Sequence, residues 1–218
     1  MEQNNETPEK DDAHILLFDE GGEWGYKDES SKFVLIAVSD IVNRGDFALI
    51  ALKYPWNTRK GQRSKNPDNE LKFSSSSDEI RRAVVDHISR EDIAIHTVAR
   101  KKDENDPDKA KRGSKKYLEI FEDVAKNVIE HTPAKRLYAY IDQTDNLRGD
   151  IGCEAIRKIA ARYGKEVIEC KKVVSAEHLL MQPHDFVAGS FVQFHEYNDP
   201  SYIYVLKDSI RTMKIFKK

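Results

Sequence analysis

The sequence predicts an α/β fold in which helices cover the faces of a mixed sheet. The first observation is a leading pair of apolar, β-branched runs at 13–18 and 33–38, which we expect to pair as antiparallel strands. The second is that predicted helices and strands alternate along the rest of the chain. Alternation after an antiparallel pair is typical of a mixed sheet with helices on its faces.

The elements follow in order. Residues 43–53 are ambiguous, because Phe47, Ile50 and Ala51 fit a helical stripe while 47–52 is apolar enough for a strand. Ser77 is a plausible N-cap for a helix that ends near Ile88. Further strands are expected at 93–99, 136–141 and from 167 onwards, and further helices at 117–129, 151–163 and 182–197. Pro183 is placed at the first position of the last helix, and the final stretch 202–218 has a mixed pattern.

Length and composition indicate one domain. The chain has 218 residues, of which 1–12 contain no apolar run and are predicted to be a disordered tail, leaving one domain over 13–218. The formal net charge is −2, from 36 basic and 38 acidic residues, so the whole chain has no general attraction for nucleic acid. Local basic patches can still bind it.

The two cysteines and the apolar runs bear on the compartment. Cys153 and Cys170 have no close partner at zinc-ligand spacing, and a disulfide between them stays open. Two cysteines in a chain of this size usually indicate a reducing compartment. No run approaches 18 apolar residues, so no membrane span or membrane partner is expected. We therefore expect a cytoplasmic protein.

Acidic residues stand where two predicted strands end. The run at 14–18 stops at Asp19, and the run at 136–141 stops at Asp142. Each aspartate has an equally good alternative role as a turn former. Asp185 suits the first turn of a helix through the helix dipole, although its surroundings are unusually apolar. Glu70 alone carries almost no signal.

Together these carboxylates predict a metal centre. If the two strands are parallel neighbours, Asp19 and Asp142 lie close together at the carboxyl edge of the sheet, where ligands bind in open α/β folds. Two adjacent carboxylates repel, so that one stays protonated unless a cation is present. Oxygen ligands favour Mg²⁺ or Mn²⁺. Two such ions about 4 Å apart can activate water and stabilise the leaving oxygen of a phosphodiester.

Four short motifs, in order, resemble a known family. They are Asp19-Glu20-Gly21-Gly22 after a buried strand, Glu70-Leu71-Lys72, Ile141-Asp142, and Ser175 followed by 180–189, which includes Gln182, Asp185 and Gly189. The chain thereby resembles, over about 14–191, the family catalogued as domain of unknown function 3800. It departs from the family pattern at Gly21, which replaces a serine, and at Pro183 and His184, which replace small residues.

The resemblance implies a ribonuclease-H-like mixed sheet with helices on both faces and a metal centre of Asp19, Glu70, Asp142 and Asp185. On this hypothesis Asp19 bridges two Mg²⁺ or Mn²⁺ ions, Asp142 binds one, and Glu70 and Asp185 complete the coordination. The implied reaction is in-line hydrolysis of a phosphodiester. Glu20 is assigned a supporting role, in which it is either exposed to solvent or contacts the metal ligands without binding the metal itself.

Several other residues have both a functional and an ordinary interpretation. Lys72 could neutralise a phosphate or form an ion pair with a nearby carboxylate, and Lys101 and Lys102 could act similarly or belong to a solvated charge run. His184 could shuttle protons or serve as an extra ligand, but a surface or hydrogen-bonded histidine is the better interpretation. The basic segments 59–65 and 109–116 are candidate phosphate contacts, and Tyr54 and Trp56 could stack on bases or be buried.

These observations give one leading hypothesis and two alternatives. The leading one is a Mg²⁺- or Mn²⁺-dependent hydrolase of phosphodiesters, specifically a nuclease with RNA or DNA as substrate. The first alternative is a non-catalytic ribonuclease-H-like module that binds nucleic acid or a partner protein. The second is phosphoryl chemistry on a small nucleotide, because a fold does not fix a substrate. The oligomeric state stays open.

Overall fold

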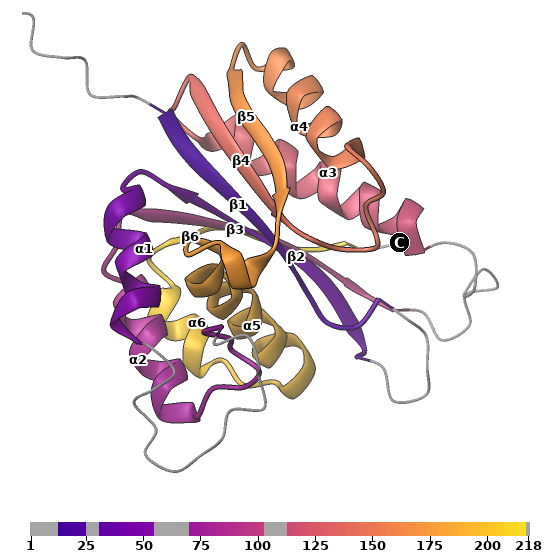
Figure 1. The fold of residues 1–218 in the computed structure, drawn as a ribbon. Coiled ribbons are helices and arrows are strands. Elements are labelled where there is room, and N and C mark those ends of the chain that lie inside the picture. Colours follow the sequence, from indigo (N-terminus) through magenta and orange to yellow (C-terminus); the bar gives the residue numbers. More distant parts are fainter. Residues whose placement is uncertain (1–12, 25–30, 55–69, 103–112, 217–218) are drawn as a thin grey trace, which may run out of the picture.

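The computed structural model describes residues 13–24, 31–54, 70–102 and 113–216 (Figure 1). The predicted tail at 1–12 and the basic loop at 59–65 lie outside these residues, as do Trp56 and residues 109–112. Six strands form one mixed sheet in the order β5-β4-β1-β2-β3-β6. The α/β class and the mixed sheet predicted from the sequence are confirmed.

The strands are β1 (Ala13–Gly21), β2 (Phe33–Ile41), β3 (Ile93–Lys101), β4 (Arg136–Asp142), β5 (Glu166–Val173) and β6 (Ile210–Phe216). β2 pairs antiparallel with both β1 and β3, while the β1–β4, β4–β5 and β3–β6 pairs are parallel. The expected antiparallel pairing of the first two strands is therefore confirmed. Five of the six strands run in one direction, so their carboxyl ends lie together at one end of the sheet.

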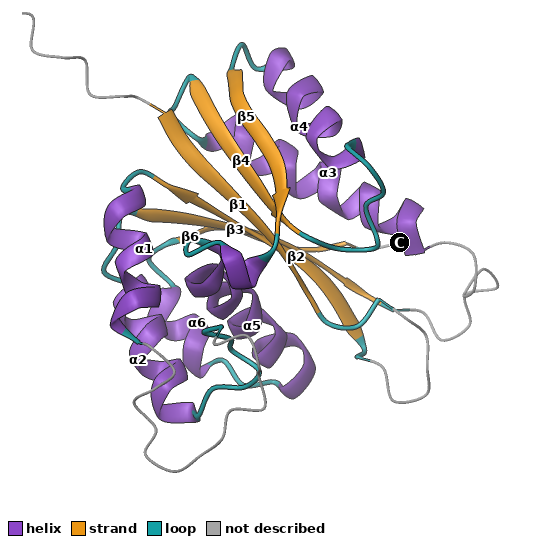
Figure 2. Ribbon diagram, in the orientation of Figure 1, coloured by secondary structure: helices purple, strands orange, loops and turns teal. Residues whose placement is uncertain are grey.

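The helices are α1 (Arg44–Lys53), α2 (Asp78–Ile88), α3 (Gly113–His131), α4 (Ile151–Arg162), α5 (Met181–Tyr197) and α6 (Ser201–Leu206). They divide between the two faces of the sheet, with α3 and α4 on one face and the other four helices on the opposite face (Figure 2). None of the described helices is long and apolar enough to cross a membrane.

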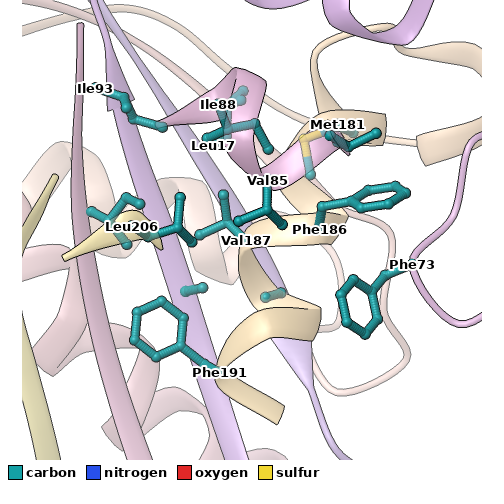
Figure 3. Close-up of a cluster of buried hydrophobic side chains, with 14 of the residues drawn as sticks. Leu17, Phe73, Val85, Ile88, Ile93, Met181, Phe186, Val187, Phe191 and Leu206 are labelled. Carbon is teal, nitrogen blue, oxygen red and sulfur yellow. The ribbon is translucent and has the colours of Figure 1, made fainter. Parts of the chain in front are cut away.

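Each face of the sheet has its own apolar core. On the α5 face, side chains from β1, α2, α5 and α6 meet around Leu17, Val85, Val187, Phe191 and Leu206 (Figure 3). The residues of β1 alternate between the faces, so Leu16 and Phe18 belong to the opposite core, beneath α3 and α4. This alternation determines which face each acidic side chain occupies.

The structure settles several expectations about individual elements. The ambiguous segment 43–53 is a helix, and its three predicted stripe residues are its buried ones. Ser77 caps α2, because its side chain accepts a hydrogen bond from the backbone N–H of Ile80. Pro183 is the third residue of α5 and not the first, and the mixed stretch after residue 200 forms α6 and β6.

A disulfide joins Cys153 on α4 to Cys170 on β5. The bond ties the edge strand β5 to the helix that covers it, within the α3–α4 face of the molecule. The sequence left this pairing open. A disulfide is the form expected in an oxidising compartment, so the pairing does not support the cytoplasmic expectation, which stays a prediction.

Candidate metal centre

Asp19 and Asp142 lie side by side at the carboxyl ends of two parallel neighbouring strands. The pairing of β1 with β4 places Phe18 opposite Ile141, and the two aspartates are the next residues along each strand. Leu17 and Tyr140, two residues earlier, belong to the core on the α5 face. Side chains alternate along a strand, so both carboxylates face α5. Asp19 is buried and Asp142 is half-buried.

Asp185 approaches the same position from α5, which packs across β1 and β2. Its Oδ2 accepts a hydrogen bond from the backbone N–H of Phe73 at 2.6 Å. Three residues earlier on the helix, the Gln182 Oε1 accepts one from the backbone N–H of Leu71 at 3.2 Å. The first turns of α5 therefore hold the 70–73 segment beside the ends of β1 and β4.

Gly189 lets this segment come close to α5. A Cβ atom at Gly189 would lie 2.4 Å from Cγ of Phe73, well inside van der Waals contact. Gly189 lies one helical turn after Asp185, so both residues face the same segment. The Gln182, Asp185 and Gly189 spacing thus has a structural cause, which is to seat the chain that carries Glu70.

Glu70 and Lys72 are the two charged side chains of this segment. Glu70 is buried, and its Oε2 lies 3.2 Å from Nζ of Lys72. Burial lowers the pKa of Lys72, but Glu70, and after it Asp185 and Asp142, raise it by more. The ion-pair interpretation of Lys72 is therefore confirmed. The charge of the same ammonium group lowers the pKa of Asp142 and Asp185.

The electrostatics show that the acidic side chains converge. Burial raises the pKa of Asp19 well above its usual value, and the charges of Asp185 and Asp142 raise it further. Burial also raises the pKa of Asp142, and Glu70 adds to this shift. The pKa of Asp185 rises to about 6, mainly through burial, although the hydrogen bond from Phe73 opposes the shift. Each of the three aspartates therefore interacts electrostatically with at least one other predicted ligand.

A cleft of about 710 Å³ opens beside these carboxylates. The described residues that line it are Glu20, Glu70, Lys72, Asp142, Gln143, Thr144, Asp145, Asn146, Val174, Ser175 and Ala176. Asp19, which is buried, and Asp185, which is half-buried, are outside this lining. The carboxylates thus extend from the cleft wall into the protein interior.

Glu20 has a larger part in this site than the sequence indicated. It is half-buried, lines the cleft, and accepts hydrogen bonds from Thr144 Oγ1 at 3.0 and 3.1 Å and from Asn146 Nδ2 at 3.3 Å. Burial raises its pKa, which these hydrogen bonds partly oppose. Glu20 therefore secures the loop that follows Asp142. A polar run directly after a strand-ending aspartate was the available signal for this loop.

His184 is a structural residue of the α5–sheet contact. Its Nε2 donates to the Ala37 carbonyl at 3.2 Å, so its Nδ1 accepts from the Ser39 hydroxyl at 2.8 Å. Complete burial lowers its pKa to about 3, and the imidazole is neutral at physiological pH. The hydrogen-bonded interpretation is confirmed, and the proton-shuttle alternative is wrong.

The remaining candidates lie away from the carboxylates or outside the described residues. Tyr54 is half-buried against the α5-face core, and its hydroxyl donates to the Ala83 carbonyl at 3.2 Å. Lys101 is exposed at the end of β3, which suits a solvated charge run. Lys102 is half-buried, and burial lowers its pKa. At the start of α3, Lys115 is exposed.

The donor set suits Mg²⁺ or Mn²⁺ in its chemistry, because all four side chains offer carboxylate oxygens. Within the described residues, however, no three His, Cys, Asp or Glu side chains are already grouped so that they could hold a metal ion. Compared with known proteins, the chain matches no protein-family model and no curated protein.

Proposed function

We propose that the protein is a Mg²⁺- or Mn²⁺-dependent hydrolase of phosphodiesters, acting as a nuclease. The observation that carries this proposal is the convergence of Asp19 and Asp142, in adjacent register on parallel strands, with Asp185 and Glu70. Among the described residues that line the cleft, Lys72 is the one cation. Neighbouring carboxyl groups of this kind are costly to ionise together unless a cation binds between them.

The strand order also supports the finer fold assignment. A mixed sheet with β5-β4-β1-β2-β3 as consecutive neighbours, and β2 reversed, is consistent with the ribonuclease-H-like fold that the sequence motifs imply. In this fold the two aspartates would occupy the metal-binding edge. The resemblance to the family catalogued as domain of unknown function 3800 belongs to this proposal as well.

The described side chains have separate roles in the proposed reaction. Asp19, Glu70, Asp142 and Asp185 would hold the metal, which when bound supplies positive charge for the phosphate oxygens and a water of lowered pKa. Lys72 orients a phosphate at the cleft wall when it exchanges its contact with Glu70 for the substrate. Glu20 keeps the loop after Asp142 in place, which fixes the wall that faces the scissile bond.

The test is cleavage of end-labelled RNA, DNA and RNA–DNA hybrid with Mg²⁺, with Mn²⁺ and with EDTA. We expect metal-dependent cleavage that Asp19→Asn and Asp142→Asn abolish, while Asp150→Asn, an exposed acid outside the cleft lining, retains it. Titration of Mn²⁺ followed by electron paramagnetic resonance gives a readout independent of activity. Cleavage that survives both site substitutions would sink the assignment.

The same assay separates this proposal from the alternative, a ribonuclease-H-like module that binds nucleic acid or protein without catalysis. In that case RNA or DNA binds in EDTA as well as in Mn²⁺, and no substrate is cleaved. Asp19→Asn would then leave the affinity unchanged or strengthen it by removing negative charge.

A further inference from the structure

The strand β6 forms one edge of the sheet. It pairs with β3 on one side, and in the described part of the chain no strand pairs with its other side. An edge strand presents unpaired N–H and C=O groups that can pair with another chain. β6 spans seven residues without proline or glycine, and its one register irregularity is at its start. Among the described residues, the outer backbone edge of β6 is therefore open to pairing.

Exposed apolar side chains gather in the same part of the chain. In the described residues the C-terminal elements contribute Tyr197, Tyr204, Val205, Met213, Ile215 and Phe216 to the exposed large hydrophobic side chains. Met213 is 45% exposed and Ile215 is 51% exposed. They lie two residues apart and so share one face of β6, in register with Thr97 and Ala99 of β3. Exposed apolar side chains that share one face of an edge strand, as Met213 and Ile215 do, mark an interaction site.

The opposite face of β6 is already held by the protein. Nζ of Lys214 donates to the Asn127 side chain at 2.6 Å, and the Thr212 hydroxyl lies 3.0 Å from Nδ1 of His96. The Arg100 guanidinium lies over the ring of Phe216. These contacts fix the strand on β3 and α3. A partner could therefore contact the face of β6 that carries Met213 and pair with the outer backbone edge of this strand.

We propose that β6 pairs antiparallel with β6 of a second copy of this chain, about a two-fold axis at Met213. This register places Met213 opposite Met213 of the other copy, Arg211 opposite Ile215, and Thr212 opposite Lys214. No two charges of the same sign face each other directly, and the aliphatic part of Arg211 covers Ile215. The two sheets then form one continuous sheet with a shared apolar strip.

A second copy through β6 fits better than a partner through the other sheet edge. The β5 edge carries charges of both signs, including the Lys171–Glu169 ion pair at 2.9 Å. Pairing β6 with β5 of another copy would be head-to-tail and would continue as an open chain, whereas β6–β6 pairing closes as a two-fold dimer. In the strand order, β3 and β2 separate β6 from β1 and β4, so the dimer leaves the cleft open.

The first experiment measures mass by light scattering during size exclusion over a wide concentration range. We expect the full chain to reach twice its mass of 25.1 kDa. Met213→Glu would place two carboxylates opposite each other and return the monomer. Leu49→Glu changes a side chain of similar exposure on α1, at 54%, and should keep the dimer. A wild-type chain that stays monomeric, or a Met213→Glu dimer of undiminished stability, overturns the proposal.

The second experiment tests the register. Both native cysteines form the disulfide, so an introduced cysteine supplies the one free thiol in the described residues. Met213→Cys places two thiols across the two-fold axis and should cross-link the copies under mild oxidation. Thr212→Cys places its thiol opposite Lys214 on the other face and should not. The reverse result refutes the register, and neither experiment depends on nuclease activity.

Discussion

Replacing Asp185 with asparagine should stabilise the metal-free protein above neutral pH. Burial is the main reason that the pKa of Asp185 rises from 3.8 to about 6 in the folded chain. Because the folded pKa is the higher one, the native state holds the proton more tightly than the unfolded state, and ionisation costs stability as pH rises from about 4 to about 6. A shift of about 2 units corresponds to at most about 3 kcal/mol, since neighbouring carboxylates share the repulsion.

Urea unfolding in EDTA at pH 8 and pH 4 measures this cost. With a slope of roughly 2–3 kcal/mol per molar urea, Asp185→Asn should raise the midpoint by about 1 M at pH 8 and by little at pH 4. Asp150→Asn, at an exposed acid, is the matched control. The quantity compared is the difference in urea midpoint between each variant and wild type, because other groups titrate in the same pH range. Protonation of His184, for example, lowers stability as pH falls, which is opposite to the effect of Asp185.

Metal ions should reduce the difference in stability between the two proteins. Wild type gains stability by mass action, about 2.7 kcal/mol when free Mn²⁺ is a hundredfold above its dissociation constant, and Asp185→Asn gains less because it lacks one carboxylate. The reasoning is refuted if Asp185→Asn is no more stable than wild type at pH 8 in EDTA. It is equally refuted if the advantage is the same at pH 4.

Three further predictions concern residues around the site. Gly189→Ala should cost roughly 1–3 kcal/mol of stability in urea unfolding, because its Cβ would meet Phe73; an unchanged midpoint would show that Phe73 moves freely. In the wild type, the neutral His184 imidazole must take up a proton as the pH falls from 6.5 towards 3, which lowers stability. His184→Gln should reduce this loss by up to about 5 kcal/mol, and equal acid sensitivity of both proteins contradicts the prediction. The disulfide joins Cys153 and Cys170, which are 17 residues apart, and its reduction should lower the free energy of unfolding by roughly 3 kcal/mol. The stability of a Cys153→Ser variant should not change when reductant is added.

The sequence predicts the central strands well because they are buried on both faces. The run that ends at Asp19 is continuously apolar, and continuity over a short length indicates a buried strand. The last strand escapes prediction for the opposite reason. β6 lies at the sheet edge with most of its residues exposed, so its apolar residues do not alternate strictly with polar ones. The pairing that stabilises it comes from β3, more than a hundred residues away.

The site is predictable to a similar, limited extent. Asp19 and Asp142 are found because each ends a buried strand, and their adjacency follows once the strands are parallel neighbours. Gln182 and Gly189 enter the prediction only through the family resemblance, because each acts on a segment more than a hundred residues earlier in the chain. Glu20 is underestimated because its partners come from the loop after β4.

Asp185 combines two roles that one pair of substitutions can separate. One carboxylate oxygen accepts a hydrogen bond from the Phe73 N–H, which seats the 70–73 segment. The negative charge of the same group is repelled by Asp142 and Glu70. Asparagine keeps an oxygen for the N–H and removes the charge, whereas alanine removes both. Asp185→Ala should therefore be less stable than Asp185→Asn by about 1–3 kcal/mol, the cost of a buried N–H without an acceptor. If the two variants unfold at the same urea concentration, the hydrogen bond does not seat the segment, and the position of Glu70 must depend on Gln182 instead.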